Sequence, residues 1–189
     1  DLTIAAIITA PNAVSGLGVI RVSGVNAWNV AGALLKKSSG KKTFSPESIK
    51  SHVFNRCLLM SSSGQCLDDG MFVWMKAPRS FTGEDVIELH LHGNPLLLRR
   101  VMDELQRAGA RAALPGEFSF RAFRNGKISL DQAESVADLI SSRSEDAAKR
   151  ALGQLLGHSK EPIARLKKLL IDRLAEIELD IDFSDQGVS

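Results

Sequence analysis

Residues 86–109 carry the pattern that most constrains the fold of this chain. From Val86 onward apolar and polar side chains alternate, which predicts a strand with one apolar and one polar face. Asn94 and Pro95 then provide the N-cap and the first position of a helix, and Gly109 is placed to end it. Such a strand, turn and helix commonly present polar groups at the end of a sheet. The side chains on the polar face of the strand are Glu88, His90 and His92.

The first 114 residues alternate between strand and helix patterns. Strands are predicted at 3–9, 19–22, 52–59, 71–75 and 86–92, and helices at 26–35 and 95–108. These elements predict an α/β layer structure, with a hairpin turn at 61–65 between two of the strands. Because the composition changes near Leu114-Pro115-Gly116, we expect domains at 1–114 and 115–189. The expected fold class is therefore α+β, with a sheet domain followed by an all-helical segment.

From Ser129 onward the pattern is helical. Ser129 and Gln132 form a capping box for one helix, and a second helix is predicted over about 147–156. From Pro162 an apolar seam recurs at steps of three and four residues: Ile163, Leu166, Leu170, Leu174, Ile177 and Ile181. Such a seam needs a partner, which is either further helices of the same domain or a second copy of the chain.

Composition and motifs argue against several classes of protein. The net charge of +2 is too small to indicate nucleic-acid binding, so RNA contact would need a local basic patch. No apolar run approaches the ~18 residues of a membrane span and no secretory signal pattern is present, so we expect a soluble intracellular protein. Two cysteines without CxxC spacing argue against a disulfide scaffold or a structural zinc site. The sequence contains no GxxxxGK[ST] loop, so we expect no GTP binding.

The polar strand face at Glu88 supports two hypotheses. His90 and His92, two residues apart with a carboxylate nearby, can chelate a metal ion, but no second cluster of ligands stands out. Alternatively, the Glu88 carboxylate can accept two parallel hydrogen bonds from an N–H/N–H edge of a planar heterocycle, as a pterin ring presents. We favour the second hypothesis, and we expect neither a metal site nor catalytic residues.

Three motifs occur in order along the chain: GVIRVSG at 18–24, FTGEDVIELHLHG at 81–93, and PGEFSFRAFRNGKISLDQAE at 115–134. With them the chain closely resembles the N-terminal part of the MnmE (TrmE) family of tRNA-modifying GTPases, from Thr3 to about Asp185. The resemblance implies a tetrahydrofolate-binding-like sheet domain that also dimerises, followed by the first helices of a helical domain. Family members continue into a GTPase domain, which would bind GTP, Mg²⁺ and K⁺, and end in a cysteine motif; neither is in these 189 residues.

The resemblance also implies a cofactor, site residues and partners. Matching the motifs residue by residue places Arg21, Glu88 and Lys127 in a pocket for 5-formyl- or 5,10-methylene-tetrahydrofolate. The implied function is modification of C5 of the tRNA wobble uridine in the cytoplasm or an organelle. The implied partners are a second copy of the chain, tRNA and the flavin-dependent protein MnmG (GidA). This chain departs from the family pattern at Asn94, where a second glycine is usual, and in the turn 12–17 before Arg21.

Other functions remain open at this point. The chain could be a stand-alone folate enzyme of the aminomethyl-transfer type, although no catalytic pair stands beside Glu88. It could also be a structural or RNA-docking fragment without cofactor, in which Arg21 and Glu88 form only a surface ion pair worth ~1 kcal/mol or less.

Overall fold

The computed structural model describes residues 2–10, 12–38, 43–157 and 160–184, and every structural statement below concerns these residues. The chain forms two compact units, Asp1–Ile128 and Ser129–Ser189. The first contains a mixed sheet with helices and the second is helical, which confirms the expected α+β class.

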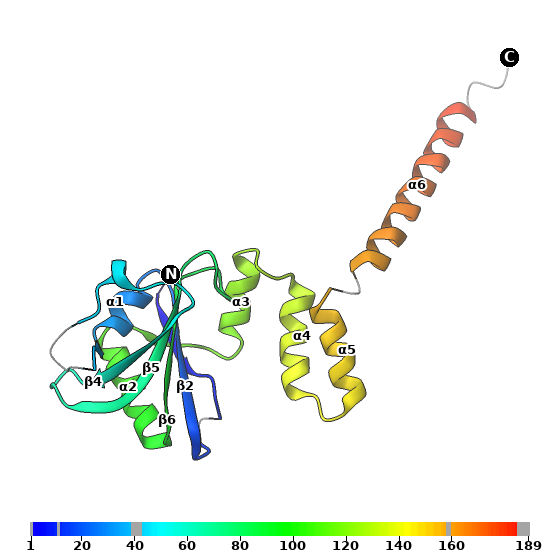
Figure 1. The fold of residues 1–189 in the computed structure, drawn as a ribbon. Coiled ribbons are helices and arrows are strands. Elements are labelled where there is room, and N and C mark those ends of the chain that lie inside the picture. The colour runs from blue at the N-terminus through cyan, green and yellow to red at the C-terminus, as the bar shows by residue number, and fades with distance from the viewer. Residues whose placement is uncertain (1, 11, 39–42, 158–159, 185–189) are drawn as a thin grey trace. The chain divides into compact units, whose positions relative to one another are not determined.

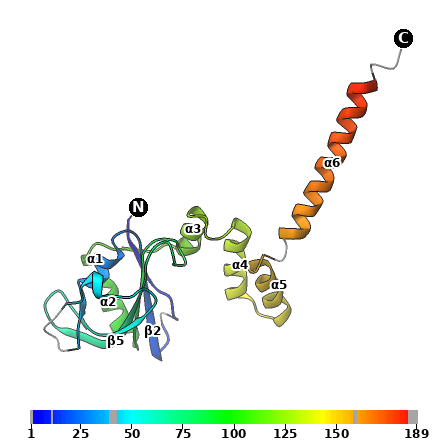
Figure 2. The same ribbon diagram turned by 45° about the horizontal axis from the view of Figure 1, so that its top comes forward.

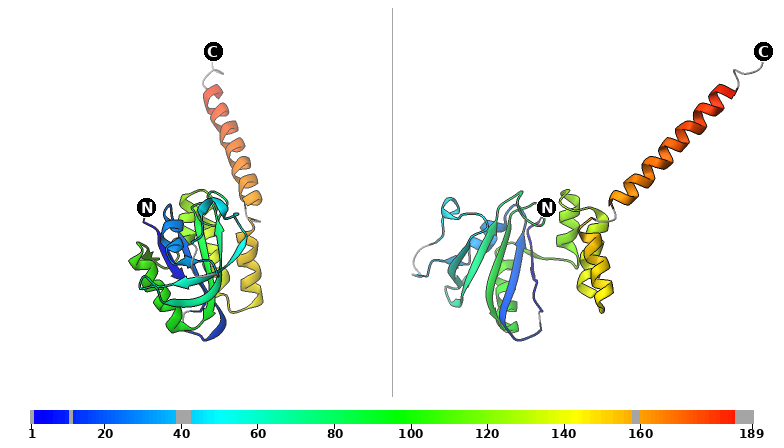
Figure 3. Two further views of the ribbon diagram at one scale, coloured as in Figure 1. Left: turned by 60° about the vertical axis from the view of Figure 1, so that its left-hand side comes forward. Right: turned by 45° about the vertical axis from the view of Figure 1, so that its right-hand side comes forward.

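The sheet of the first unit has seven strands in the order β3-β4-β5-β6-β2-β1-β7 (Figure 1). All neighbouring strands are antiparallel except the pair β1 and β7, which is parallel. Figure 3 shows β2 running beside β6 in two further views. The strands are β1 (Ile4–Ile7), β2 (Ser15–Ser23), β3 (Leu35–Lys36), β4 (Phe54–Met60), β5 (Cys66–Met75), β6 (Val86–Gly93) and β7 (Arg111–Ala112).

Two helices, α1 (Ala27–Gly32) and α2 (Pro95–Arg107), cover one face of the sheet (Figure 2). The predicted cap of α2 is confirmed, because the Asn94 side chain accepts hydrogen bonds from the backbone N–H groups of Leu96 and Leu97. One core cluster joins both helices to the alternate residues of the central strands. Its largest fully buried side chains include Phe72, Ile20, Ile87, Leu89, Leu98 and Leu105. The opposite face of the sheet carries the alternating residues that the sequence predicted to be polar.

The structure divides the chain at Ile128/Ser129 and not near Leu114, where we expected the boundary. The reason is a helix that we did not predict, α3 (Glu117–Arg124), which belongs to the first unit. Buried Arg121 on this helix pairs with Glu84 in the loop before β6, and Asn125 donates a hydrogen bond to the Thr82 carbonyl oxygen. These bonds attach α3 to the sheet domain. A short 3₁₀ helix, η1 (Pro46–Ser48), completes this unit.

The second unit contains α4 (Leu130–Ser141), α5 (Glu145–Leu155) and α6 (Lys160–Ser184). The predicted capping box at Ser129 and Gln132 is confirmed, and the Gln132 side-chain amide also donates to the Leu155 carbonyl oxygen at 2.7 Å. The apolar seam of α6, from Ile163 to Ile181, is exposed, with more than half of each side chain accessible. Among the described residues, no helix is both long enough and apolar enough to cross a membrane.

Candidate functional site

The face of the sheet opposite α1 and α2 arranges its side chains in two neighbouring rows. Strand register fixes these rows, because residues paired across antiparallel strands point to the same side. The first row runs across β2, β6, β5 and β4 as Arg21, Glu88, Val73 and Phe54. The second row, two residues along each strand, is Val19, His90, Met71 and Arg56.

Arg21 and Glu88 form a partly buried ion pair in the first row. The Nε and Nη2 groups of Arg21 both donate to Glu88 Oε1, at 2.9 and 2.7 Å, and the side chains are 24% and 16% exposed. The other carboxylate oxygen, Oε2, lies 3.3 Å from His90 Nε2, which is a long hydrogen bond. Glu88 therefore holds the arginine with one oxygen and keeps the second as the more available acceptor.

Two aromatic rings lie close to the Arg21 guanidinium. The guanidinium carbon lies 5.7 Å from the centre of the Phe81 ring and 5.5 Å from that of Phe118, which is cation–π distance. Phe81 comes from the loop before β6 and Phe118 from α3. The guanidinium that pairs with Glu88 thus also makes cation–π contacts to two rings from different parts of the chain.

The loop that carries Phe81 is tied down at several points. Thr82 Oγ1 lies 2.8 Å from Ser23 Oγ in a fully buried contact. Lys127 Nζ donates to the Pro78 carbonyl oxygen at 3.0 Å, and its aliphatic stem lies against Gly83, which adopts a φ of 78°. Of the three residues that the sequence placed in the site, the structure thus brings Arg21 and Glu88 into contact. The third residue, Lys127, contacts Pro78 and Gly83 in the adjoining loop, and not the ion pair.

Arg121 is the centre of a second polar network in this unit, and the sequence analysis did not predict it. Arg121 is 3% exposed and pairs with Glu84 at 3.0 Å and with Glu117 at 3.1 Å, while Nη2 also donates to the Leu2 carbonyl oxygen at 2.8 Å. Hydrogen bonds from Arg111, from the Leu114 N–H and from Arg121 lower the pKa of Glu117 to about 2. Glu117 is therefore ionised at neutral pH, and the ion pairs of Arg121 with Glu84 and Glu117 connect α3 to the loop before β6.

The two histidines of β6 have different partners. His90 contacts Glu88, and the ring of Phe54 packs edge-on against it at 4.9 Å. His92 Nδ1 lies 2.7 Å from Asp68 Oδ1, and this hydrogen bond with the nearby carboxylate charge raises the pKa of His92. The histidines therefore do not converge on a common point. The described residues include no group of three or more His, Cys, Asp or Glu side chains that could hold a metal ion.

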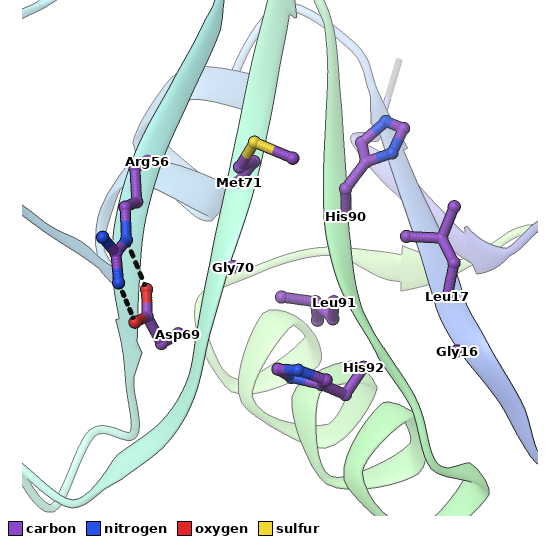
Figure 4. Close-up of a pocket in the computed structure, with 9 residues that line it drawn as sticks. All are labelled: Gly16, Leu17, Arg56, Asp69, Gly70, Met71, His90, Leu91 and His92. Carbon is purple, nitrogen blue, oxygen red and sulfur yellow. Dashed lines mark hydrogen bonds and ion pairs between the residues drawn. The ribbon is translucent and has the colours of Figure 1, made fainter.

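An open pocket of about 430 Å³ lies on the same sheet face, next to the ion pair (Figure 4). His90 and Met71 line one end, Leu17 lies on the β2 side, and Arg56 lies on the β4 side. Arg56 donates two hydrogen bonds to Asp69, from Nε at 3.1 Å and from Nη2 at 2.6 Å. The pocket thus combines apolar side chains with an exposed guanidinium.

Sequence reasoning assigned no role to Phe81, Phe118 or Arg121. All three lie within the motifs at 81–93 and 115–134, but they are far from Arg21 along the chain. Periodicity within one element carries no information about such long-range contacts, so only their presence in a motif could have drawn attention to them.

Comparison with known proteins gives the same division of the chain. Residues 3–127 match the family described as GTP-binding protein TrmE N-terminus, and residues 130–189 match the MnmE helical domain. The tRNA modification GTPase MnmE of Aquifex aeolicus (strain VF5) is 42% identical over 181 residues, which are 96% of this chain and 39% of that protein. The protein of the same name from Syntrophotalea carbinolica is 43% identical over 188 residues, 100% of this chain and 40% of that protein. The chain thus spans about two fifths of the length of these relatives.

Proposed function

The chain belongs to the TrmE/MnmE family of tRNA modification GTPases, and from this premise we propose that its sheet unit binds a one-carbon tetrahydrofolate. The cofactor would be 5-formyl- or 5,10-methylene-tetrahydrofolate, whose carbon serves to modify C5 of the tRNA wobble uridine.

The observation that carries this proposal is the partly buried Arg21–Glu88 pair. A pterin ring presents a ring N–H and an amino group side by side, and a carboxylate accepts both in a bidentate manner. The second oxygen of Glu88 has only one long hydrogen bond, to His90, so it is the more available acceptor for such an edge, and Oε1 can accept from the ligand only if it shares or exchanges its bonds to Arg21. Arg21, in cation–π contact with both rings, would then face the carbonyl or another electron-rich part of the cofactor.

Lys127 has the third role in the proposed site. It is exposed, and its ammonium group donates one hydrogen bond to a backbone carbonyl oxygen. A lysine ammonium offers three donors, so it can keep this bond and still meet an anionic or carbonyl group of the cofactor.

At the level of the whole protein, the proposal includes functions that need more than these residues. GTP hydrolysis, with Mg²⁺ and K⁺, would lie in a GTPase domain outside this sequence. Homodimerisation through the sheet unit and cooperation with tRNA and the flavin-dependent MnmG protein, in the cytoplasm or an organelle, are likewise proposed.

Calorimetric titration of the chain with 5-formyl-tetrahydrofolate tests the binding site. We expect saturable binding that Glu88→Ala or Arg21→Ala weakens roughly ten- to hundredfold, because loss of a charge-assisted pair costs on the order of 1.5 to 3 kcal/mol. The matched control is Arg173→Ala, which removes an exposed arginine from its pair with Glu176 on α6. Unchanged affinity in both site variants would refute the assignment of the pocket.

A further inference from the structure

The sheet unit gathers positive charge from three segments that are far apart in the sequence. The loop that follows β5 is at the centre, and the Lys76 N–H donates to Ser51 Oγ at 3.0 Å, which places this loop beside the segment that contains Lys50. On its other side the loop accepts a hydrogen bond from Lys127 at the Pro78 carbonyl oxygen. We call these cations the basic loop surface: Lys50, Lys76, Arg79, Arg124 and Lys127.

Two cations of the basic loop surface are available to a partner. Lys50 and Arg79 are exposed, and within the described part of the chain neither side chain has a hydrogen bond or an ion pair. This differs from the second unit, where for example Arg173 pairs with Glu176 one helical turn away. The free cations thus lie on the sheet unit, where a local basic patch of the kind needed for RNA contact has formed.

The acids near this surface are engaged within the protein. Glu84 pairs with buried Arg121 at 3.0 Å, and Asp85 accepts a hydrogen bond from the Ala77 N–H at 2.8 Å. The carboxylate of Glu47, which lies near Lys76, is hydrogen-bonded to a neighbouring serine hydroxyl. These acids therefore reduce the positive charge of the surface without occupying its two unpaired cations.

A hollow of about 470 Å³ opens within the basic loop surface. Its lining combines an apolar side chain, acceptors and a cation: Val25, Gly83, Asp85, Arg124 and Asn125. A flat heterocycle with both N–H groups and carbonyl oxygens suits such a lining, and an unstacked nucleobase has this character.

The same loop carries an exposed aromatic ring. Phe81 is 36% exposed, and its ring also lies 5.7 Å from the Arg21 guanidinium carbon. Proteins that bind single-stranded RNA combine cations for the phosphates with aromatic rings on which bases stack. Cations, a ring and a polar hollow together favour RNA over an acidic protein surface, which would use the cations alone.

We propose that the basic loop surface binds a single-stranded loop of RNA, a proposal that rests on the proposed function because that loop would carry the wobble uridine. Lys50 and Arg79 meet phosphate groups, and a base that flanks the uridine enters the hollow beside Val25. The RNA then approaches the Arg21–Glu88 pair from the side of residues 76–85.

Fluorescence anisotropy with a labelled RNA hairpin, whose loop has the sequence of an anticodon loop, tests the phosphate contacts. Arg79→Gln should weaken binding about threefold, and the double variant with Lys50→Gln about tenfold. Each lost contact should also lower the slope of log affinity against log salt concentration by about 1. The matched control is Arg99→Gln, which removes an exposed arginine of α2 and should change neither quantity.

A second pair of variants tests the hollow. Val25→Asp places a negative charge there and should weaken hairpin binding about tenfold, whereas Val14→Asp makes the same change at an exposed valine outside the hollow and should have no effect. A fully paired RNA duplex of equal length has no unstacked base, so its affinity should be lower than that of the hairpin and should respond less to Val25→Asp.

The outcomes separate this proposal from the proposed function. All these variants should keep the parent affinity for 5-formyl-tetrahydrofolate in calorimetry, since none removes a residue assigned to the cofactor. Folate binding without hairpin binding, or full hairpin affinity in the double variant and in Val25→Asp, would overturn the RNA surface and leave the cofactor site standing. Competition by a poly-glutamate peptide as strong as that of unlabelled hairpin would also overturn it and indicate an acidic protein partner. Unchanged tryptophan emission verifies that each variant is folded.

Discussion

Replacing Arg121 by methionine should destabilise the sheet unit more than any other single change at an ionised side chain of α3. The substitution keeps the aliphatic length but removes the charge and the hydrogen bonds to Glu84, Glu117 and the Leu2 carbonyl oxygen. Removal of one member of a buried ionic network costs about 3–5 kcal/mol, because its partners stay buried without compensation. Glu117 keeps Arg111, so we expect a value near the lower end, about 3 kcal/mol.

Urea unfolding followed by tryptophan fluorescence measures this loss. Both tryptophans of the chain, Trp28 and Trp74, lie in the first unit, so the signal reports that unit alone. With a denaturant slope of about 1.5 kcal/mol per M, the midpoint should fall by roughly 2 M. The control is Arg124→Met on the same helix. The Arg124 guanidinium lies 3.7 Å from a Glu84 carboxylate oxygen and its side chain is 41% exposed, so its loss should lower the free energy of unfolding by less than about 1 kcal/mol.

A double variant tests whether the loss comes from uncompensated charge. Glu84→Gln added to Arg121→Met should recover part of the stability, because the neutral amide no longer needs a cation. If Arg121→Met is no more destabilising than Arg124→Met, the network is not what attaches α3 to the sheet, and the argument for the boundary at Ile128/Ser129 loses its physical basis.

Three further results are expected. Asn94→Ala should cost about 1 kcal/mol in the same assay, because two N–H groups of α2 lose their acceptor, whereas a larger loss would indicate another role. Glu117→Gln should abolish a pH-dependent share of stability that the parent keeps above about pH 4.5 and loses as the pH falls toward 2, since the folded-state pKa is about 2. The chain should show no saturable binding of a fluorescent guanine nucleotide at micromolar concentration, since its sequence has no phosphate-binding loop.

The elements with strong periodicity could be predicted from the sequence. The alternation at 86–92 gave β6 with the correct two faces, and the cap at Asn94 gave the start of α2. The ion pair between Arg21 and Glu88 follows from the register of β2 and β6, whereas the role of the two residues in a cofactor site stays a prediction from the family resemblance. In these segments local pattern and tertiary environment favour the same structure.

Strand ends were harder to predict, because pairing partners decide them. β2 begins at Ser15 and not at Val19, through a stretch with two glycines that shows little strand preference. A small residue suits this part of β2, since a Cβ atom at Gly18 would lie 2.6 Å from a Leu98 methyl group of α2 and 3.2 Å from the Gly93 Cα atom of β6. Similarly β5 begins at Cys66, where two aspartates that disfavour strands are paired with β4.

The helix α3 was missed because Pro115-Gly116 was interpreted as a domain boundary. Gly116 adopts a left-handed conformation, with φ of 74°, at the N-cap position of that helix, so the same residues begin an element of the sheet unit. What holds α3 in place is Arg121, and its partners in the loop before β6 are far away in sequence. No local signal indicates such a contact.

The long separation in sequence between these partners has a consequence for synthesis on the ribosome. Arg21 and its strand are made early, but the Phe118 ring that covers it, and the Arg121 that reaches back across 119 residues to Leu2, emerge much later. Until then Arg21 of the nascent chain lacks its contact with Phe118, and one face of the sheet is uncovered. Contacts between residues so far apart in sequence also form slowly. The contacts around Arg21, where we propose the cofactor site, are therefore completed among the last steps in the maturation of this unit, during an interval when chaperones would have access to the bare sheet.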